Sequence, residues 1–112
     1  MDLVVLVYEV TKRFPKEELY GLTNQVRRAA TSVPANIAEG SGRGTKRDYV
    51  HFLRIAQGSL RELETYLLLV IDLTLAPPET VAPLLKQTDS VARLLNRLIQ
   101  ALEKPSPASL TT

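Results

Sequence analysis

The stretch of residues 33–47, VPANIAEGSGRGTKR, constrains the fold more than any other part of the chain. It places Pro34 inside an apolar helical pattern, follows it with a glycine-rich turn at residues 40–44, and then begins a basic segment. Glycines end a helix at little conformational cost, so those at positions 40, 42 and 44 predict a helix end. The stretch therefore predicts two helices that meet at a turn, with the densest positive charge of the chain at the start of the second.

Pro34 predicts an irregularity inside the first of these two helices. Its ring nitrogen cannot donate a hydrogen bond to the carbonyl of Ala30, so we expect the helix to kink there. Asn36 falls beside the apolar face just after the proline, where its side chain can satisfy a freed backbone group.

Hydrophobic periodicity predicts four helices and no strand. The third is the clearest, over residues 45–73, where apolar residues alternate spacings of four and three and form a heptad seam. Thr45 is a suitable N-cap, Asp48 completes a start that is similar to a capping box, and the two prolines at 77 and 78 end the helix. The seam consists of Tyr49, Leu53, Ala56, Leu60, Leu63, Leu67 and Val70.

The other three helices are predicted over residues 2–13, 22–39 and 78–103. The β-branched residues of the first also suit a strand, but a lone strand would have no partner, so we assign a helix. The apolar faces consist of Leu3, Leu6 and Val10 in the first; Leu22, Val26, Ala29, Val33 and Ile37 in the second; and Val81, Leu84, Thr88, Val91, Leu95, Leu98 and Leu102 in the last.

Four amphipathic helices with short connections predict an all-α, antiparallel up-down four-helix bundle over residues 1–103. Residues 104–112 have the composition of a disordered C-terminal tail. The third helix carries apolar residues outside its seam, and a small bundle cannot bury two stripes of one helix, so we expect a homo-oligomer. The alternative is a broad core-facing stripe in a monomer. These additional residues are Phe52, Ile55, Leu68, Leu69 and Leu73.

Composition narrows the classes to which the protein can belong. There is no cysteine, which excludes disulfides and thiolate metal sites and fits a reducing compartment. No signal peptide is visible, and the longest later apolar run, residues 66–71, is far shorter than the roughly 20 residues that span a bilayer. We therefore expect a cytoplasmic protein that does not associate with membranes. A net charge of +2 permits a nucleic-acid partner without requiring one.

The residues that catalysis would need are poorly supplied, so we expect no enzymatic activity and no cofactor or metal. The only histidine is His51, for which a surface pairing with Asp48 is favoured over a role as a catalytic base. Glu62 and Glu64 are two positions apart on a helix and face different directions. The glycine run of residues 40–46 lacks the Walker spacing and lies between two helices rather than after a strand.

The candidate nucleic-acid-binding residues lie at and along the third helix. Arg43, Lys46 and Arg47 surround its start, where free backbone N–H groups attract phosphate. Arg47, Arg54 and Arg61 recur every seven residues and share one face. Repeated in an oligomer, this stripe would offer a phosphate backbone a multivalent surface. The alternative is a solvated, well-capped helix start with ordinary surface charge.

Further basic residues extend this hypothesis, and acidic neighbours limit it. Arg27 and Arg28 are candidates for the same patch or for a subunit contact. Asp89 stands four positions before Arg93, which favours a surface ion pair on the fourth helix, and such pairs contribute little. No aromatic platform accompanies the charges, so we expect weak sequence specificity. The fourth-helix stripe is Lys86, Arg93, Arg97 and Lys104, and the acids that could neutralise both stripes are Asp48, Glu62, Glu64 and Asp89.

Several short motifs resemble a known family. The chain is similar to the four-helix-bundle family first noted in intervening sequences of large-subunit ribosomal RNA genes, strongly over about residues 10–75. It departs from the family in a shorter first helix and a modest net charge. The motifs that carry the resemblance are LYGLT at 19–23, QVRRAA at 25–30, VPANIAEG at 33–40, FL at 52–53, GSL at 58–60 and ELET at 62–65.

The resemblance implies an antiparallel bundle assembled as a ring-shaped homopentamer with a central channel, and no established enzymatic activity. One branch of the family resembles the accessory variability determinant of diversity-generating retroelements, which binds its reverse transcriptase and nucleic acid through a basic surface. The resemblance thus implies three partners: other copies of the chain, RNA or DNA, and a reverse transcriptase. The alternative is a protein-interaction scaffold that does not bind nucleic acid.

Overall fold

The computed structural model describes residues 2–18 and 21–105, and the described residues form four α-helices and no strand. The predicted helix ranges are confirmed to within two residues at each end. The tail predicted at 104–112 lies outside the described residues from position 106 onward. The elements are α1 (Asp2–Thr11), the short 3₁₀ helix η1 (Lys16–Glu18), α2 (Leu22–Ser41), α3 (Lys46–Asp72) and α4 (Pro78–Glu103).

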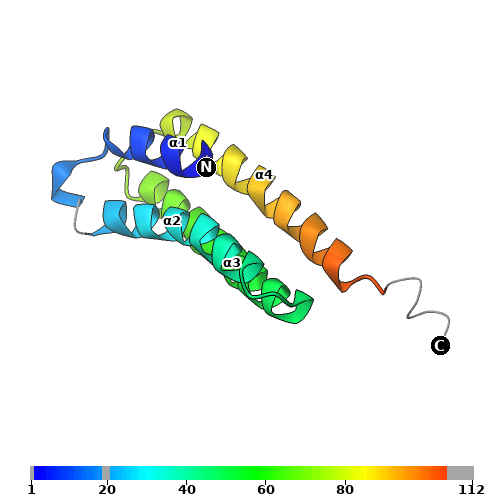
Figure 1. Ribbon diagram of the computed structural model, residues 1–112. Helices are drawn as coiled ribbons and strands as arrows, with labels where there is room; N and C mark the ends of the chain where they lie inside the picture. The colour runs from blue at the N-terminus through cyan, green and yellow to red at the C-terminus, as the bar shows by residue number, and fades with distance from the viewer. Residues whose placement is uncertain (1, 19–20, 106–112) are drawn as a thin grey trace.

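Successive helices run in opposite directions and pack as a four-helix bundle (Figure 1). α2 and α3 lie side by side along their lengths and share the most extensive interface. α4 packs on α3, and α1 packs against both α2 and α4. The core between these helices consists of Leu3, Val7, Val10, Phe14, Val26, Ala29, Ala30, Val33, Leu53, Ala56, Leu60, Leu63, Leu67, Val70, Ala76, Val81, Leu84, Val91, Leu95 and Ile99.

The bundle has four helices at one end and three at the other. α1 has 10 residues and α4 has 26, which at about 1.5 Å per residue correspond to roughly 15 Å and 39 Å. The C-terminal half of α4 therefore extends beyond α1 and keeps α3 as its neighbour (Figure 1). This geometry corrects the predicted seam of α4: Ile99 is buried there, whereas Leu98 and Leu102 are only partly buried.

α2 continues through Pro34 as one helix, so the proline does not divide it. Asn36 does not satisfy the backbone carbonyl that Pro34 frees, contrary to the expectation. Its side-chain amide donates to the carbonyl of Ser32 at 2.8 Å and to the Ser32 hydroxyl at 3.0 Å, rather than to the carbonyl of Ala30. The same hydroxyl is 2.7 Å from that of Ser59 on α3, so these side chains join the two helices.

The three glycines after Pro34 have different structural roles. Gly40 lies inside α2 and is buried, so the prediction that it ends the helix is wrong. A Cβ atom on Gly40 would stand 2.7 Å from the Cβ of Phe52, which shows that glycine permits the close approach of α3. Gly42 is the C-cap of α2, and Gly44 forms the turn with a φ of 86°.

α3 ends at Asp72, several residues before the double proline. Leu73 is the C-cap, and Thr74 adopts the left-handed conformation with a φ of 55°. The backbone N–H of Leu75 bonds to the carbonyl of Val70 at 2.9 Å, as in a Schellman ending. The backbone reversal therefore precedes the prolines, which lie at the start of α4.

Candidate nucleic-acid interface

The start of α3 is capped as the sequence predicts. The Thr45 hydroxyl oxygen accepts a hydrogen bond from the backbone N–H of Asp48 at 3.1 Å. Asp48 also places a carboxylate in the first turn, where it interacts favourably with the helix dipole. An anion at this helix end would therefore compete with groups that the chain supplies itself, and its attraction depends mainly on the basic side chains nearby.

Arg43 is held against α2 by neighbouring side chains. Its guanidinium forms a 2.6 Å ion pair with Glu39, one turn earlier in α2. It also lies over the ring of Phe52, with 5.0 Å from the guanidinium carbon to the ring centre. Both contacts orient Arg43 and offset part of its charge, although about half of the side chain is exposed.

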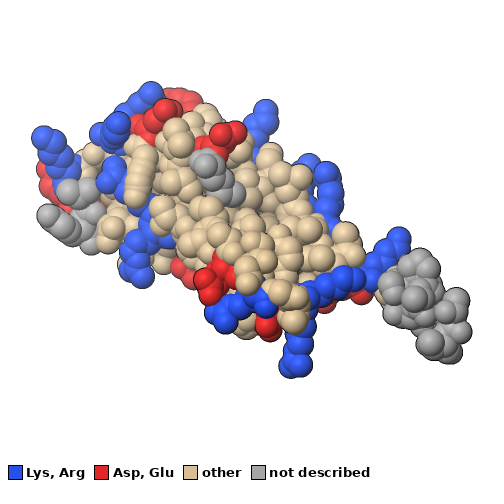
Figure 2. Space-filling view, viewed as in Figure 1, with Lys and Arg blue, Asp and Glu red and all other residues tan. Residues whose placement is uncertain are grey.

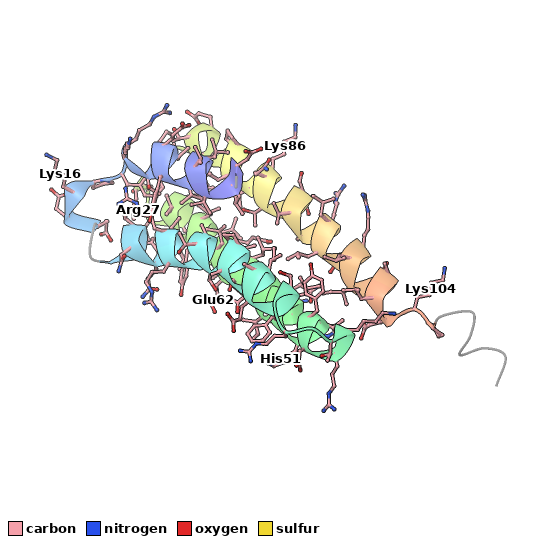
Figure 3. The ribbon with its side chains drawn as sticks, in the orientation of Figure 1. Lys16, Arg27, His51, Glu62, Lys86 and Lys104 are labelled. Atoms are coloured by element: carbon pink, nitrogen blue, oxygen red, sulfur yellow. The ribbon has the colours of Figure 1, made fainter. Side chains whose placement is uncertain are left out.

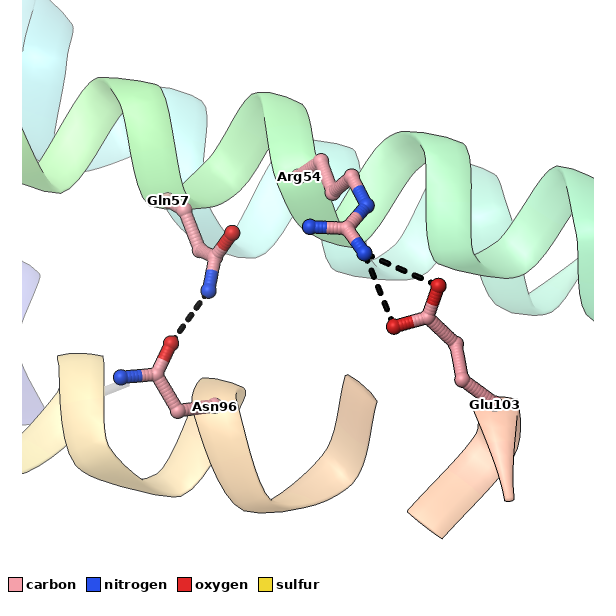
Figure 4. A network of polar contacts seen from close by, with 4 residues as sticks. All are labelled: Arg54, Gln57, Asn96 and Glu103. Carbon is pink, nitrogen blue, oxygen red and sulfur yellow. Dashed lines mark hydrogen bonds and ion pairs between the residues drawn. The ribbon is translucent and has the colours of Figure 1, made fainter. Parts of the chain in front are cut away.

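Arg54 is also neutralised, by a residue that the sequence analysis did not identify. One terminal nitrogen of its guanidinium lies 2.8 Å and 2.9 Å from the two carboxylate oxygens of Glu103 (Figure 4). Beside this ion pair, the Gln57 amide donates to the side-chain carbonyl of Asn96. Both contacts join α3 to α4, so the predicted arginine stripe runs beside the interface between these helices.

Three of the five candidate residues, Lys46, Arg47 and Arg61, are exposed and form no ion pair within the described part of the chain. Lys46 and Arg47 border a shallow hollow of about 220 Å³ between the start of α3 and the end of α4. Arg61 lies four helical turns further along the α3–α4 interface. In the view of Figure 2, basic side chains line the edges of the molecule and uncharged surface occupies its middle.

The basic stripe of α4 is partly neutralised. Arg93 forms the expected ion pair with Asp89, at 3.0 Å. The other acids named as possible partners, Asp48, Glu62 and Glu64, form no ion pair with any described residue. Lys86, Arg97 and Lys104 are exposed and likewise lack an ion pair in the described ranges.

Comparison with known proteins places this arrangement in a family. A model of the 23S rRNA-intervening sequence protein family matches residues 1–97. The chain belongs to this family. The resemblance seen in the sequence motifs is thereby confirmed, and no curated protein matches the chain.

A solved structure has the same fold as this chain. It is a protein of unknown function of the S23 ribosomal protein family from Bacteroides thetaiotaomicron, with a TM-score of 0.81. The two are 23% identical, and the match covers 88% of this chain and 93% of that one. At this identity the likeness establishes the four-helix fold and no shared activity.

His51 does not form the expected pair with Asp48. His51 is exposed and meets the ring of Phe52 edge-on, with 5.4 Å between ring centres, and it forms no ion pair with Asp48. Within residues 2–18 and 21–105, no three or more His, Cys, Asp or Glu side chains are grouped as metal ligands would be. No helix in the same ranges combines the length and apolar character required to cross a membrane.

Of the two ion pairs at the site, one could be predicted from the sequence and the other could not. The Glu39–Arg43 pair follows the spacing of four that brings side chains together on a helix, so it was available in the sequence. The Arg54–Glu103 pair joins residues 49 positions apart and depends on how α4 packs.

Arg27 lies toward the opposite end of the bundle from His51, so it does not extend the patch at the start of α3 (Figure 3).

Proposed function

We propose that this protein is a non-enzymatic, cytoplasmic helical bundle that assembles with copies of itself and binds nucleic acid through phosphate contacts. The observation that carries the proposal is the exposure of Lys46 and Arg47, without ion pairs in the described chain, in the first turn of α3. Arg61 adds a third cation of this kind on the same side of the helix. Arg43 and Arg54 contribute less, because carboxylates already neutralise them.

Phosphate contacts of this kind favour affinity over sequence recognition. Flexible exposed cations release counterions from a nucleic-acid backbone, so binding should weaken steeply as salt is added. The hollow that Lys46 and Arg47 border has no aromatic residue in its lining, although Tyr49 lines a neighbouring hollow with Lys46. Base recognition is not part of the proposal.

Self-assembly is supported by apolar side chains on the surface of α3. Ile55, Leu69 and Leu73 are 39%, 40% and 59% exposed, and their spacing places them on one face of the helix. Leu68, 45% exposed, lies on a different side of the same helix. The family resemblance suggests a ring of five copies, which would bring several weak cationic sites together and raise avidity for a long strand.

Binding of labelled single-stranded RNA and duplex DNA over a salt series tests the proposal. The Lys46→Gln/Arg47→Gln variant should bind more weakly at low salt. Its slope of log affinity against log salt should fall by about 2, roughly one for each phosphate that the variant no longer neutralises. A matched control is Lys86→Gln/Arg97→Gln, which removes the same charge from exposed residues of α4. An equal loss of affinity in the control, or no binding by the parent at low salt, would overturn the proposal.

A reverse transcriptase is the protein partner that the resemblance suggests. Co-purification with a reverse transcriptase encoded beside this gene would support an accessory role in a retroelement. The second candidate function is a protein-interaction scaffold without nucleic-acid binding, favoured by the exposed leucines of α3 and the neutralised arginines. A parent chain that captures such a partner but does not retard RNA or DNA would favour the scaffold.

A further inference from the structure

A small pocket lies between α3 and α4, near the middle of both helices. It has a volume of about 80 Å³, and its floor consists of Leu60, Thr88 and Ala92. Because threonine and alanine have short side chains, α4 leaves space beside Leu60. A water needs only about 10–15 Å³ of such space, so the pocket can hold the edge of a larger molecule.

Two amide side chains close one end of this pocket. The Gln57 amide donates to the side-chain carbonyl of Asn96, and both residues line the pocket. This contact orients the Asn96 amide, whose nitrogen points away from Glu103 and toward the N-terminal half of α4 (Figure 4). The nitrogen has no hydrogen-bond acceptor among the described residues, so it is available to donate to a ligand.

The α3 wall of the pocket carries two opposite charges that do not neutralise each other. Arg61 and Glu64 are exposed, and neither forms an ion pair with a described residue. Their spacing of three would permit such a pair on the surface of a helix. The pocket is therefore bordered by a free guanidinium, which donates hydrogen bonds, and by a free carboxylate, which accepts them.

Glu64 does not suit a surface that binds phosphate alone. A carboxylate beside Arg61 repels a phosphate backbone and lowers the attraction that the basic residues provide. Its position suits a neutral group that donates hydrogen bonds. The floor adds no free polar group, because the buried Thr88 hydroxyl already donates to the carbonyl of Leu84 at 2.7 Å.

The free groups of the pocket match one nucleobase better than the others. A carboxylate accepts most strongly from two donors that lie side by side, and the Asn96 amide requires an acceptor next to them. Guanine presents this pattern on its Watson–Crick edge, as the N1–H, the exocyclic amine and the O6 oxygen. Adenine, cytosine and uracil each present a single donor group there. Such edges are accessible when the base is unpaired.

The pocket lies along the proposed nucleic-acid interface. About 20 Å of α3 separates Arg47 from Leu60, and Arg61 borders both the basic stripe and the pocket. Leu68, one turn after Glu64 and 45% exposed, continues this face of α3 with apolar surface. A strand whose phosphates contact the start of α3 therefore reaches the pocket if it follows the interface between α3 and α4.

We propose that this pocket binds the Watson–Crick edge of an unpaired guanine in a single strand held by phosphate contacts. Glu64 accepts hydrogen bonds from the N1–H and the exocyclic amine, the Asn96 amide donates to O6, and Arg61 contacts a neighbouring phosphate. The inference rests on the proposed function and adds to it a base preference, which phosphate contacts alone do not provide.

Competition between short RNA strands tests the pocket. The probe is a labelled strand of uridines, compared with the same strand in which one central base is guanine, adenine, cytosine or hypoxanthine. The parent should prefer the guanine strand by about tenfold, as expected for one well-formed bidentate pair. Adenine and cytosine should give no such preference. Hypoxanthine lacks the exocyclic amine, so its preference should be smaller than that of guanine.

Two variants and a control locate this preference in the pocket. Glu64→Gln should lose most of the preference while binding the uridine strand at least as tightly as the parent, because it removes a negative charge. Ala92→Leu fills the pocket without changing a charge and should also lose the preference. Glu62→Gln is the matched control: it removes the same charge from an exposed residue of α3 outside the pocket, and it should keep the preference. Circular dichroism verifies that each variant is folded.

The guanine pocket and the phosphate interface fail in different ways. Salt-dependent binding of all strands with equal affinity would overturn the pocket and leave the interface in place. A guanine preference that survives in Glu64→Gln and Ala92→Leu, or that Glu62→Gln loses equally, would also overturn the pocket. Absence of binding by every strand at low salt would overturn both proposals.

Discussion

At the scale of single residues, the same residue type serves different purposes in different places. Gly40 permits two helices to meet, whereas Gly44 adopts a positive φ in the turn that follows. The cap at Thr45 could be predicted from the sequence, because its partner, the N–H of Asp48, is three residues away. The role of Gly40 could not, because it depends on Phe52 and Tyr49 of the facing helix.

Gly40→Ala should destabilise the bundle by about 1–3 kcal/mol, because the new Cβ would overlap the Cβ of Phe52 and force α2 away from α3. Urea unfolding followed by circular dichroism measures this change. Gly58→Ala in α3 is the matched control: its Cβ would meet no atom within 4 Å, so helix propensity alone should stabilise it by up to about 1 kcal/mol. Equal effects of the two substitutions would show that close packing at Gly40 is unimportant.

At the scale of helices, periodicity locates each element better than it assigns the buried face. The heptad seam of α3 is confirmed from Leu53 to Val70, since α3 has neighbours along its whole length. The seam predicted for α4 drifts after Leu95, because α1 does not reach that half of the helix. The periodic pattern of one helix does not predict the length of its neighbour. Which residues are buried in the C-terminal half of α4 depends on the length of α1.

Ile99→Ala should therefore cost about 2–5 kcal/mol of unfolding free energy, as expected for a large side chain that is 4% exposed. Leu94→Ala, five residues earlier on α4, removes a side chain that is 61% exposed and should change stability by about 0.5 kcal/mol or less. Chemical denaturation of both variants provides the comparison. A larger loss of stability at Leu94 would mean that the open side of α4 is covered in solution.

At the scale of the whole molecule, the exposed apolar residues Ile55 and Leu69 lie on a different side of α3 from its cations, whereas Leu68, seven residues after Arg61, lies on the basic side. The basic residues run beside α4, as the contact of Arg54 with Glu103 shows. Ile55 and Leu69 lie toward α2, on the side of α3 where Ser59 meets Ser32. A contact between copies through the apolar side would leave the basic side exposed, so assembly and phosphate binding are compatible.

The Ile55→Glu/Leu69→Glu variant should therefore convert the assembly to monomers while the helices stay folded, because it places two charges in the proposed contact between copies. Light scattering coupled to size exclusion gives the mass, and circular dichroism reports folding. Leu94→Glu, a change of the same kind on α4, should keep the mass of the parent. The monomeric variant retains Lys46, Arg47 and Arg61, so its loss of affinity for long RNA should exceed its loss for a short strand, as expected when avidity disappears. A parent that is monomeric at every concentration would refute the inference that the exposed residues of α3 join copies of the chain.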